Sequence, residues 1–102
     1  MSRTAIHPGE ILSDELEELG MTAAELGRVI QVPPNRISMI VAGKRAISVD
    51  TALRLGRYFG TSAEMWLNLQ RTYDLRTERA KLGNSLENIP ERPKPDVEAF
   101  AY

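Results

Sequence analysis

Two consecutive prolines, Pro33 and Pro34, separate two segments whose apolar residues recur at helical spacing. A residue that precedes proline is pushed out of the α region, so the first helix must stop near residue 30. Pro34 suits the first position of a new helix, where its missing N–H leaves no hydrogen bond unmade. The sequence therefore predicts two short helices, near 23–30 and 34–42, that are joined by a tight turn and cross at a steep angle.

Capping signals bound these two helices. Thr22 precedes Glu25 by three residues, which is the spacing of a capping box. Gly43 can end the second helix in the left-handed conformation, and Gly27 lies on the first helix where close approach to the second is needed. The space between the helices is predicted to be filled by Leu26, Ile30, Val32, Ile37 and Ile40.

The polar face of the second helix has the chemistry to enter a DNA major groove. Asparagine pairs with adenine and arginine with guanine, whereas Met39 and Pro34 offer apolar contact to a thymine methyl. Lys44 and Arg45, which follow this helix, are expected to lie near DNA phosphates. Thr22 and Ala23, at the start of the preceding helix, are expected there too. The alternative is an ordinary helical hairpin in a small bundle. The predicted DNA-binding residues are Thr22, Ala23, Pro34, Asn35, Arg36, Ser38, Met39, Lys44 and Arg45.

The charge distribution supports this prediction although the net charge is −1. Residues 4–27 carry six acidic residues and no Lys or Arg, whereas residues 28–57 carry six basic residues against Asp50 alone. A phosphate backbone responds to the local basic segment rather than to the average. The simpler interpretation is that each block is only a solvated helix face.

Composition excludes several classes of protein. The chain has 102 residues, 42% of them hydrophobic, which suits one small folded domain. It has no cysteine, so disulfides and thiolate metal sites are excluded. No apolar run could span a bilayer, and the first ten residues lack the apolar centre of a signal peptide, so we expect a cytoplasmic protein. His7 is expected to start a helix, because no second metal ligand or nucleophile lies nearby; we predict no metal, no cofactor and no enzymatic activity.

Three more helices are predicted near 8–19, 49–59 and 62–82, so the fold class is all-α with five helices. The helix near 8–19 should bury Ile11, Leu12, Leu16 and Leu19. The helix near 49–59, capped by Ser48, should turn inward Val49, Ala52, Leu53, Leu55, Tyr58 and Phe59. The predicted core contains Leu12, Leu16, Leu26, Ile30, Ile37, Ile40, Leu53, Phe59 and Trp66.

The long last helix carries apolar residues on more than one face. We interpret the excess as a dimer surface; the alternative is that all of them serve the core of one chain. Residues 1–82 are predicted to form the DNA-binding domain. From Gly83 the composition becomes rich in proline, so residues 83–102 are expected to be an extended or flexible tail. The dimer surface is assigned to part of Trp66, Leu69, Tyr73 and Leu75.

Residues 22–45 resemble the helix-turn-helix of phage repressors and Cro proteins. The wider pattern of HPGEIL (7–12), AGKRAISVDTALRLGRYFGTS (42–62) and EMWLNLQRTYDLR (64–76) resembles the HigA family of antitoxins, also called the VapI-like group. The resemblance covers about residues 6–80. It implies a homodimer that binds double-stranded operator DNA, represses its own promoter and neutralises a small HigB-like ribonuclease toxin. A stand-alone Xre-type regulator without a toxin partner is the alternative.

The chain departs from this family pattern at the turn. Gln31 stands where glycine is often found, and a positive φ there would cost about 1–3 kcal/mol. Pro33 and Pro34 stand where polar groups are common.

The resemblance implies a basic toxin, because the toxin is a ribonuclease that handles RNA. An acidic surface would attract such a partner. The first helix offers one, since its acidic residues cannot all point inward beside Leu12, Leu16 and Leu19. The rival toxin site is the tail with Phe100 and Tyr102, and the simplest role of the acidic face is solubility. The acidic residues are Asp14, Glu15, Glu17 and Glu18.

Overall fold

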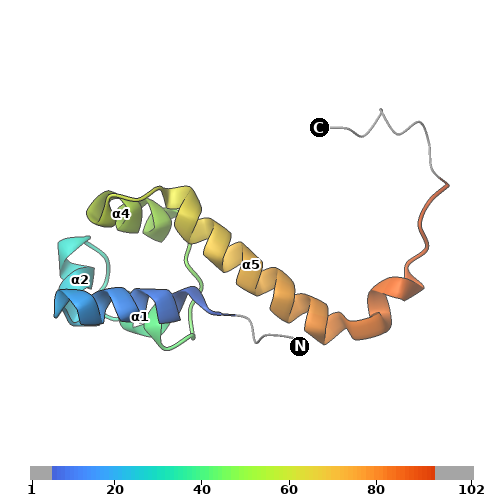
Figure 1. The fold of residues 1–102 in the computed structure, drawn as a ribbon, viewed down its shortest axis with the longest axis horizontal. Helices are drawn as coiled ribbons and strands as arrows, with labels where there is room; N and C mark the ends of the chain where they lie inside the picture. The colour runs from blue at the N-terminus through green and yellow to red at the C-terminus, as the bar shows by residue number, and fades with distance from the viewer. Residues whose placement is uncertain (1–5, 94–102) are drawn as a thin grey trace.

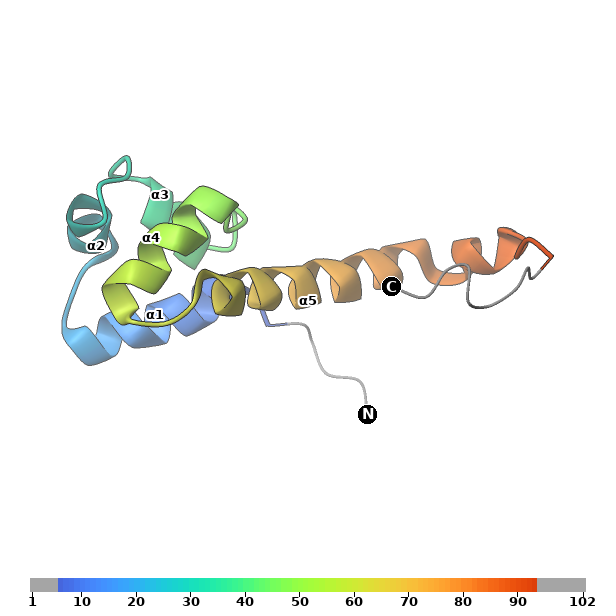
Figure 2. The ribbon, with the colours of Figure 1, turned by 90° about the horizontal axis from the view of Figure 1, so that it is seen from above.

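A computed structural model gives the structure of the chain and describes residues 6–93. Within these residues there are helices and no strands, which confirms the predicted all-α fold of five helices. A bundle of four helices lies at one end of the molecule, and the fifth helix extends away from it (Figures 1 and 2). The elements in chain order are α1 (Pro8–Leu19), α2 (Ala23–Val29), α3 (Arg36–Val41), α4 (Val49–Phe59), α5 (Ala63–Leu82) and the 3-10 helix η1 (Gly83–Asn88).

His7 starts α1 as its N-cap. Its side chain accepts a hydrogen bond from the Gly9 N–H at 2.8 Å, and the Glu10 carboxylate accepts one from the His7 N–H at 3.2 Å. The ring also packs edge-on against Tyr73 of α5, with 4.8 Å between the ring centroids. The prediction that His7 is a helix-start residue is confirmed, and the same ring joins α1 to α5.

Among the glycines of residues 6–93, the one with least room for a Cβ atom is Gly9, where α1 meets α3, and not Gly27. A Cβ atom built on Gly9 would overlap the carbonyl oxygen of Ile40, so only glycine fits there. A Cβ on Gly27 would meet its nearest neighbour, the Pro33 carbonyl oxygen, at 3.6 Å, which is an ordinary contact. The expectation of a tight approach at Gly27 is therefore wrong, and Gly9 is the residue that seats α3 against α1.

Most of the predicted core is buried, but α4 turns differently from the prediction. Leu53 and Val49 are 60% and 61% exposed, and Tyr58 is also exposed. The buried positions of α4 are instead mostly small: Thr51, Ala52, Leu55 and Gly56. A Cβ on Gly56 would lie 2.9 Å from the Thr61 carbonyl oxygen, so the turn into α5 leaves little room for a side chain at this position.

Leu19 is a second correction, because it is 48% exposed at the last position of α1. Gly20 follows as the C-cap of α1 with a positive φ of 65°, and Met21 rather than Leu19 packs against the core. Phe59 is half-buried and packs beside Trp66 with 5.7 Å between the ring centroids. The buried core consists of Leu12, Leu16, Leu26, Ile30, Val32, Ile37, Ile40, Ile47, Ala52, Leu55 and Trp66.

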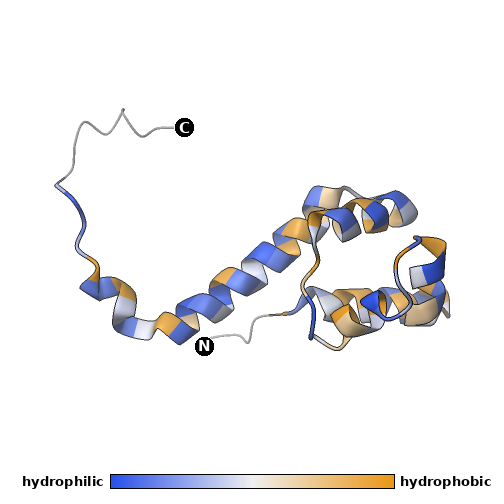
Figure 3. Ribbon diagram, turned by 180° about the vertical axis from the view of Figure 1, so that it is seen from behind, coloured by the Kyte–Doolittle hydropathy of each residue, from blue (hydrophilic) through white to orange (hydrophobic). Residues whose placement is uncertain are grey.

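α5 is 20 residues long, yet only Trp66 and Gln70 are buried in it. Beyond its first turns the helix projects from the bundle, and its ribbon there is mainly hydrophilic with scattered hydrophobic positions (Figure 3). Leu75 is 46% exposed on this part. Among residues 6–93, no helix combines the length and apolar character needed to cross a bilayer.

The segment after α5 is not extended at its start. Residues 83–88 form η1, and Gly83 adopts φ 53° where α5 ends. The segment makes this short 3-10 helix before Pro90, whose ring restricts the chain. The expectation of an extended or flexible tail is therefore wrong for these six residues. The predicted roles of Phe100 and Tyr102 lie outside the described residues.

Candidate nucleic-acid interface

The helix-turn-helix begins with the capping box that the sequence predicts. The Thr22 hydroxyl accepts from the Glu25 N–H at 3.1 Å, and Glu25 Oε1 accepts from the Thr22 N–H at 2.8 Å. The hydrogen bond from the Thr22 backbone, followed by that from its side chain and the charge of Arg28, holds the pKa of the Glu25 carboxyl below its ordinary value. The start of α2 is thus already occupied by a carboxylate.

The turn after α2 passes through Gln31, whose φ is 64°. This is the left-handed region, which a residue with a Cβ enters only at a cost. The turn is held by two backbone bonds, from the Gln31 N–H to the Arg28 carbonyl at 3.2 Å and from the Val32 N–H to the Gly27 carbonyl at 2.9 Å. The turn therefore has a positive φ at the position where the family often has glycine, although this chain has Gln31 there.

α3 begins two residues later than the sequence predicts. The Arg36 N–H bonds to the Pro33 carbonyl at 3.0 Å, so Pro34 and Asn35 form a tight turn rather than the first turn of the helix. The first α-helical bond runs from the Met39 N–H to the Asn35 carbonyl, at 3.0 Å. The helix is consequently only six residues long.

The outer surface of this turn and helix is largely polar. Pro34, Asn35 and Ser38 are exposed, and Met39 is half-buried. Ser38 Oγ donates to the Asn35 carbonyl at 3.0 Å, and Asn35 Nδ2 lies 3.8 Å from the Met39 sulfur. These bonds keep the three residues together on one face, with donors and acceptors available to base edges.

The remaining predicted residues lie on separate elements. Lys44 and Arg45 are exposed on the loop between α3 and α4. Thr22 is exposed, whereas Ala23 is half-buried at the start of α2. Because Glu25 occupies the Thr22 N–H, a phosphate at this helix start would have to compete with a carboxylate. Among residues 6–93, no carboxylate forms an ion pair with Lys44 or Arg45.

Arg36 differs from the other residues of α3 because it turns toward α4. Its side chain is 20% exposed, and its Nη1 lies 3.1 Å from Asp50 Oδ2. Asp50 also accepts from Arg54 Nε, at 3.2 and 3.1 Å to its two oxygens. Sequence analysis did not assign Asp50 or Arg54 to the interface, although their i,i+4 spacing on α4 is that of an ion pair.

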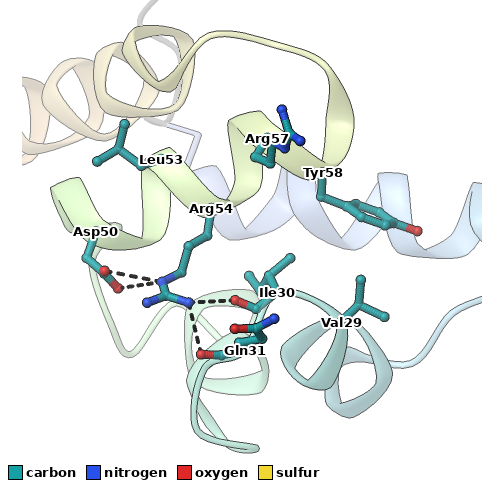
Figure 4. A pocket seen from close by; sticks show the side chains of 8 residues that line it. All are labelled: Val29, Ile30, Gln31, Asp50, Leu53, Arg54, Arg57 and Tyr58. Carbon is teal, nitrogen blue, oxygen red and sulfur yellow. Dashed lines mark hydrogen bonds and ion pairs between the residues drawn. The ribbon is translucent and has the colours of Figure 1, made fainter.

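Arg54 connects Asp50 to the turn between α2 and α3 by hydrogen bonds. Its Nη1 donates to the carbonyl oxygens of Ile30 and Gln31, at 2.9 and 3.0 Å. Figure 4 shows these bonds across an open groove of about 480 Å³ between α2 and α4. Arginine thus satisfies two carbonyls that the irregular turn leaves outside a helix. The groove is lined by Val29, Ile30, Gln31, Asp50, Leu53, Arg54, Arg57 and Tyr58.

Gln70 is a further residue that sequence analysis missed. It is buried on α5, and its Oε1 accepts from the Ile47 N–H of the basic loop at 2.8 Å. Its Nε2 donates to Asp74 at 2.9 Å. The signal was present in the sequence, because Gln70 follows Trp66 by four residues and so shares its inward face. Gln70 fixes the end of the loop that carries Lys44 and Arg45.

The predicted dimer surface needs one correction. Trp66 is 1% exposed, and its Nε1 donates to Thr61 Oγ1 at 3.1 Å, so it belongs to the core of its own chain. Leu69 and Tyr73 are half-buried, and Leu75 is exposed. Three of the four residues therefore retain surface that a second copy could cover.

The chain is similar to known proteins in both sequence and fold. Residues 12–66 match the helix-turn-helix family model. Virulence-associated protein I of Dichelobacter nodosus is 53% identical over 73 residues, which are 71% of this chain and 68% of that protein. The structure of Pseudomonas aeruginosa antitoxin HigA with the higBA promoter has a TM-score of 0.83 and 46% identity, covering 88% of this chain and 99% of that one. An addiction-module antidote protein of the HigA family from Coxiella burnetii has a TM-score of 0.82 and 44% identity, covering 91% and 99%.

Proposed function

The chain belongs to the helix-turn-helix family, and we propose that it is a HigA-type antitoxin that binds operator DNA, represses its own promoter and neutralises a small ribonuclease toxin. The observation that carries the DNA-binding part is the exposed polar face of residues 34–39, followed by the exposed Lys44 and Arg45. The structure of the Pseudomonas aeruginosa antitoxin with its promoter supports the choice of double-stranded DNA as the ligand.

Within this proposal, α3 provides the base contacts. Asn35 and Ser38 offer polar groups to base edges, and Arg36 offers a guanidinium to guanine. Pro34 and Met39 offer apolar surface to a thymine methyl. Lys44 and Arg45 neutralise phosphates, and the Thr22 hydroxyl with Ala23 lies at the edge of the contact, since the Thr22 N–H is used by Glu25.

One copy of so short a helix can contact only a few base pairs, so a two-fold dimer on inverted half-sites supplies the affinity and length of site that a promoter needs. We place the dimer surface on α5, with Leu75 and the exposed parts of Leu69 and Tyr73. The antitoxin of Pseudomonas aeruginosa and the addiction-module antidote protein of Coxiella burnetii, which the chain resembles, support a toxin partner. A stand-alone regulator is the alternative, and a small basic product of the neighbouring gene that co-purifies with the chain would decide against it.

The test of DNA binding starts with selection of duplexes from a randomised pool by the wild-type protein. Arg36→Ala should relax the preference at one base pair, at a cost of about 1–3 kcal/mol. Lys44→Ala should weaken binding to all sequences alike and lower the salt slope by about one. If both variants bind the selected duplex as the wild type does, the assigned interface is wrong.

A further inference from the structure

Arg36 is the one proposed base-contacting residue whose side chain is held by another helix. Its Nη1 donates to Asp50 of α4 at 3.1 Å, and its side chain is only 20% exposed. Its Nε is buried and has no hydrogen-bond partner. The edge of the guanidinium that contains Nε is therefore closed to solvent, and an incoming base would have to meet the end that carries Nη1 and Nη2.

Asp50 is itself fixed, although 56% of its side chain is exposed. Both of its oxygens accept from Arg54 Nε, and Arg54 Nη1 is bonded to the carbonyls of Ile30 and Gln31. Figure 4 shows the bonds from Arg54 to Asp50 and to the turn. Because Arg36 donates to the same Asp50, its direction is linked, through two side chains, to the backbone turn that precedes α3. Exposed ion pairs add little stability. The main effect of these bonds is therefore to fix the direction of the Arg36 side chain rather than to stabilise the fold.

We propose that Asp50 is a specificity-determining positioning residue, which fixes Arg36 for bidentate contact with a guanine and opposes non-specific binding to phosphates. The inference rests on the proposed DNA-binding function. An unrestrained arginine can swing to the nearest phosphate and bind any sequence. A carboxylate beside it restricts that movement, and its own charge repels the DNA backbone whatever the sequence.

This role predicts two opposite effects when Asp50 is replaced by asparagine, which keeps its shape and removes its charge. Discrimination at the base pair that Arg36 contacts should fall on the order of tenfold. Affinity for duplexes of unrelated sequence should rise on the order of tenfold at low salt and converge with the wild type at high salt. A residue that only supports the fold would lower both affinities together.

The experiment measures both quantities by fluorescence anisotropy for full-length wild type, Asp50→Asn, Arg36→Ala and the double variant. The duplexes are a selected wild-type site, its single base-pair substitutions and an unrelated sequence. The matched control is Glu64→Gln: Glu64 is exposed at the second position of α5 behind a serine cap, as Asp50 is on α4. The control should leave discrimination unchanged. In the Arg36→Ala background, Asp50→Asn should change discrimination no further.

Several results separate this inference from the proposed function. If the wild type selects no sequence, the DNA-binding function fails. If Arg36→Ala loses discrimination but Asp50→Asn keeps it, the role of Asp50 alone is overturned. Loss of discrimination by Asp50→Asn in the Arg36→Ala background also overturns it. Arg54→Met separates the two parts of the role, because it removes the bonds that fix Asp50 and leaves the charge of Asp50 in place. Discrimination should fall, since Asp50 is no longer held, whereas affinity for unrelated DNA should not rise, since the carboxylate remains. Unchanged discrimination, or a rise in affinity for unrelated DNA, would overturn the inference.

Discussion

Gln31 shows how one strained residue is tolerated in the turn between α2 and α3. Its φ of 64° places a side chain where glycine is favoured. Arg54 compensates from α4, since its Nη1 donates to the carbonyl oxygens of Ile30 and Gln31, which precede and follow the Cα of Gln31. The exposed side chain of Gln31 itself has no packing role. A substitution that relieves the strain of the left-handed backbone at Gln31 should therefore raise the free energy of unfolding.

Gln31→Gly should raise the free energy of unfolding by about 0.5–1 kcal/mol. Relief of the left-handed strain is worth about 1–2 kcal/mol, and the greater freedom of glycine in the unfolded chain offsets about 0.4–1 kcal/mol of it. Urea denaturation followed by circular dichroism measures the change. Gln31→Ala keeps the Cβ atom and should stay close to the wild type; a destabilised glycine variant would contradict this account of the turn.

Glu25 gives the capping box a pH dependence with a definite sign. Its folded-state pKa is lowered, mainly by the hydrogen bond from the Thr22 backbone. A lowered pKa in the folded state adds stability above the unfolded-state pKa, near 4.5, and this contribution is lost as the pH falls through the folded-state value.

Glu25→Gln should therefore lose stability relative to the wild type at pH 7, and the difference should shrink as the pH falls toward 3. Thermal melts at several pH values measure this convergence. Glu64→Gln on α5 is the control for loss of a carboxylate in the first turn of a helix. A gap between wild type and Glu25→Gln that stays constant over this range would show that the pKa shift is absent.

At the scale of the helices, the caps explain what the sequence could predict. The boundaries of α1 and α4 match because residues such as His7, Ser48 and Gly60 make local bonds or conformations that depend only on their neighbours. The faces of α4 were mispredicted because helical spacing allows two stripes, and hydrophobicity favours the one with Leu53. The buried face is instead the one with Thr51, Ala52, Leu55 and Gly56, and the α4–α5 turn approaches this face closely at Gly56.

The same limit applies to the interface. The candidate residues of α3 followed from their residue types and order, which are local. The Arg36–Asp50 bond joins residues 14 positions apart, and the Arg54–Gln31 bond joins residues 23 positions apart. Only the packing of α4 against the turn brings these residues together. The Gly9–Ile40 contact is equally non-local, so spacing along the chain could not distinguish Gly9 from Gly27 as the tight position.

The crossing of α1 and α3 gives a paired test of this distinction. Gly9→Ala should lower the free energy of unfolding by about 1–3 kcal/mol, because the added Cβ would overlap the Ile40 carbonyl and force the helices apart. Gly27→Ala should leave stability unchanged or raise it by up to about 1 kcal/mol, since alanine favours a helix interior and meets only ordinary contacts. Denaturant titration of both variants gives the order, and a greater loss for Gly27→Ala would contradict the packing described.

At the scale of the whole molecule, the projecting half of α5 has little support from its own chain, since none of its residues after Gln70 is buried. Leu75 on α5 and Leu86 on η1 are 46% and 48% exposed. A long helix that buries so little of one chain is more stable when a second chain covers it. This is the physical basis for placing the proposed dimer surface there.

Leu75→Glu should therefore shift the protein from dimer to monomer and reduce affinity for a selected operator, while the bundle stays folded. Light scattering at micromolar concentration measures the mass, and circular dichroism checks the fold. Leu19→Glu is the matched control, because Leu19 is 48% exposed on α1 and lies outside the proposed surface. A wild-type protein that is monomeric and still binds its operator tightly would contradict the dimer.

The proposed toxin contact depends on charge at the other end of the molecule. Asp14, Glu15, Glu17 and Glu18 are all exposed on α1, as their spacing around the buried Leu12 and Leu16 requires. A ribonuclease that handles RNA is expected to be basic, so these carboxylates should speed its association. They lie on a different helix from the proposed base contacts on α3, which would allow the toxin and DNA to be bound together.

Neutralising the four α1 carboxylates as Asn and Gln should slow association with the product of the neighbouring gene on the order of tenfold at low salt, with the difference shrinking as salt is added. Surface plasmon resonance measures the on-rate. The control neutralises four other exposed carboxylates, Glu64, Glu78, Glu87 and Glu91, so that the net charge changes equally. Equal slowing of both variants would show that the net charge of the protein, and not the acidic face of α1, sets the on-rate. An unchanged on-rate for the α1 variant, together with lost binding after truncation at Leu82, would move the toxin site to the residues that follow α5.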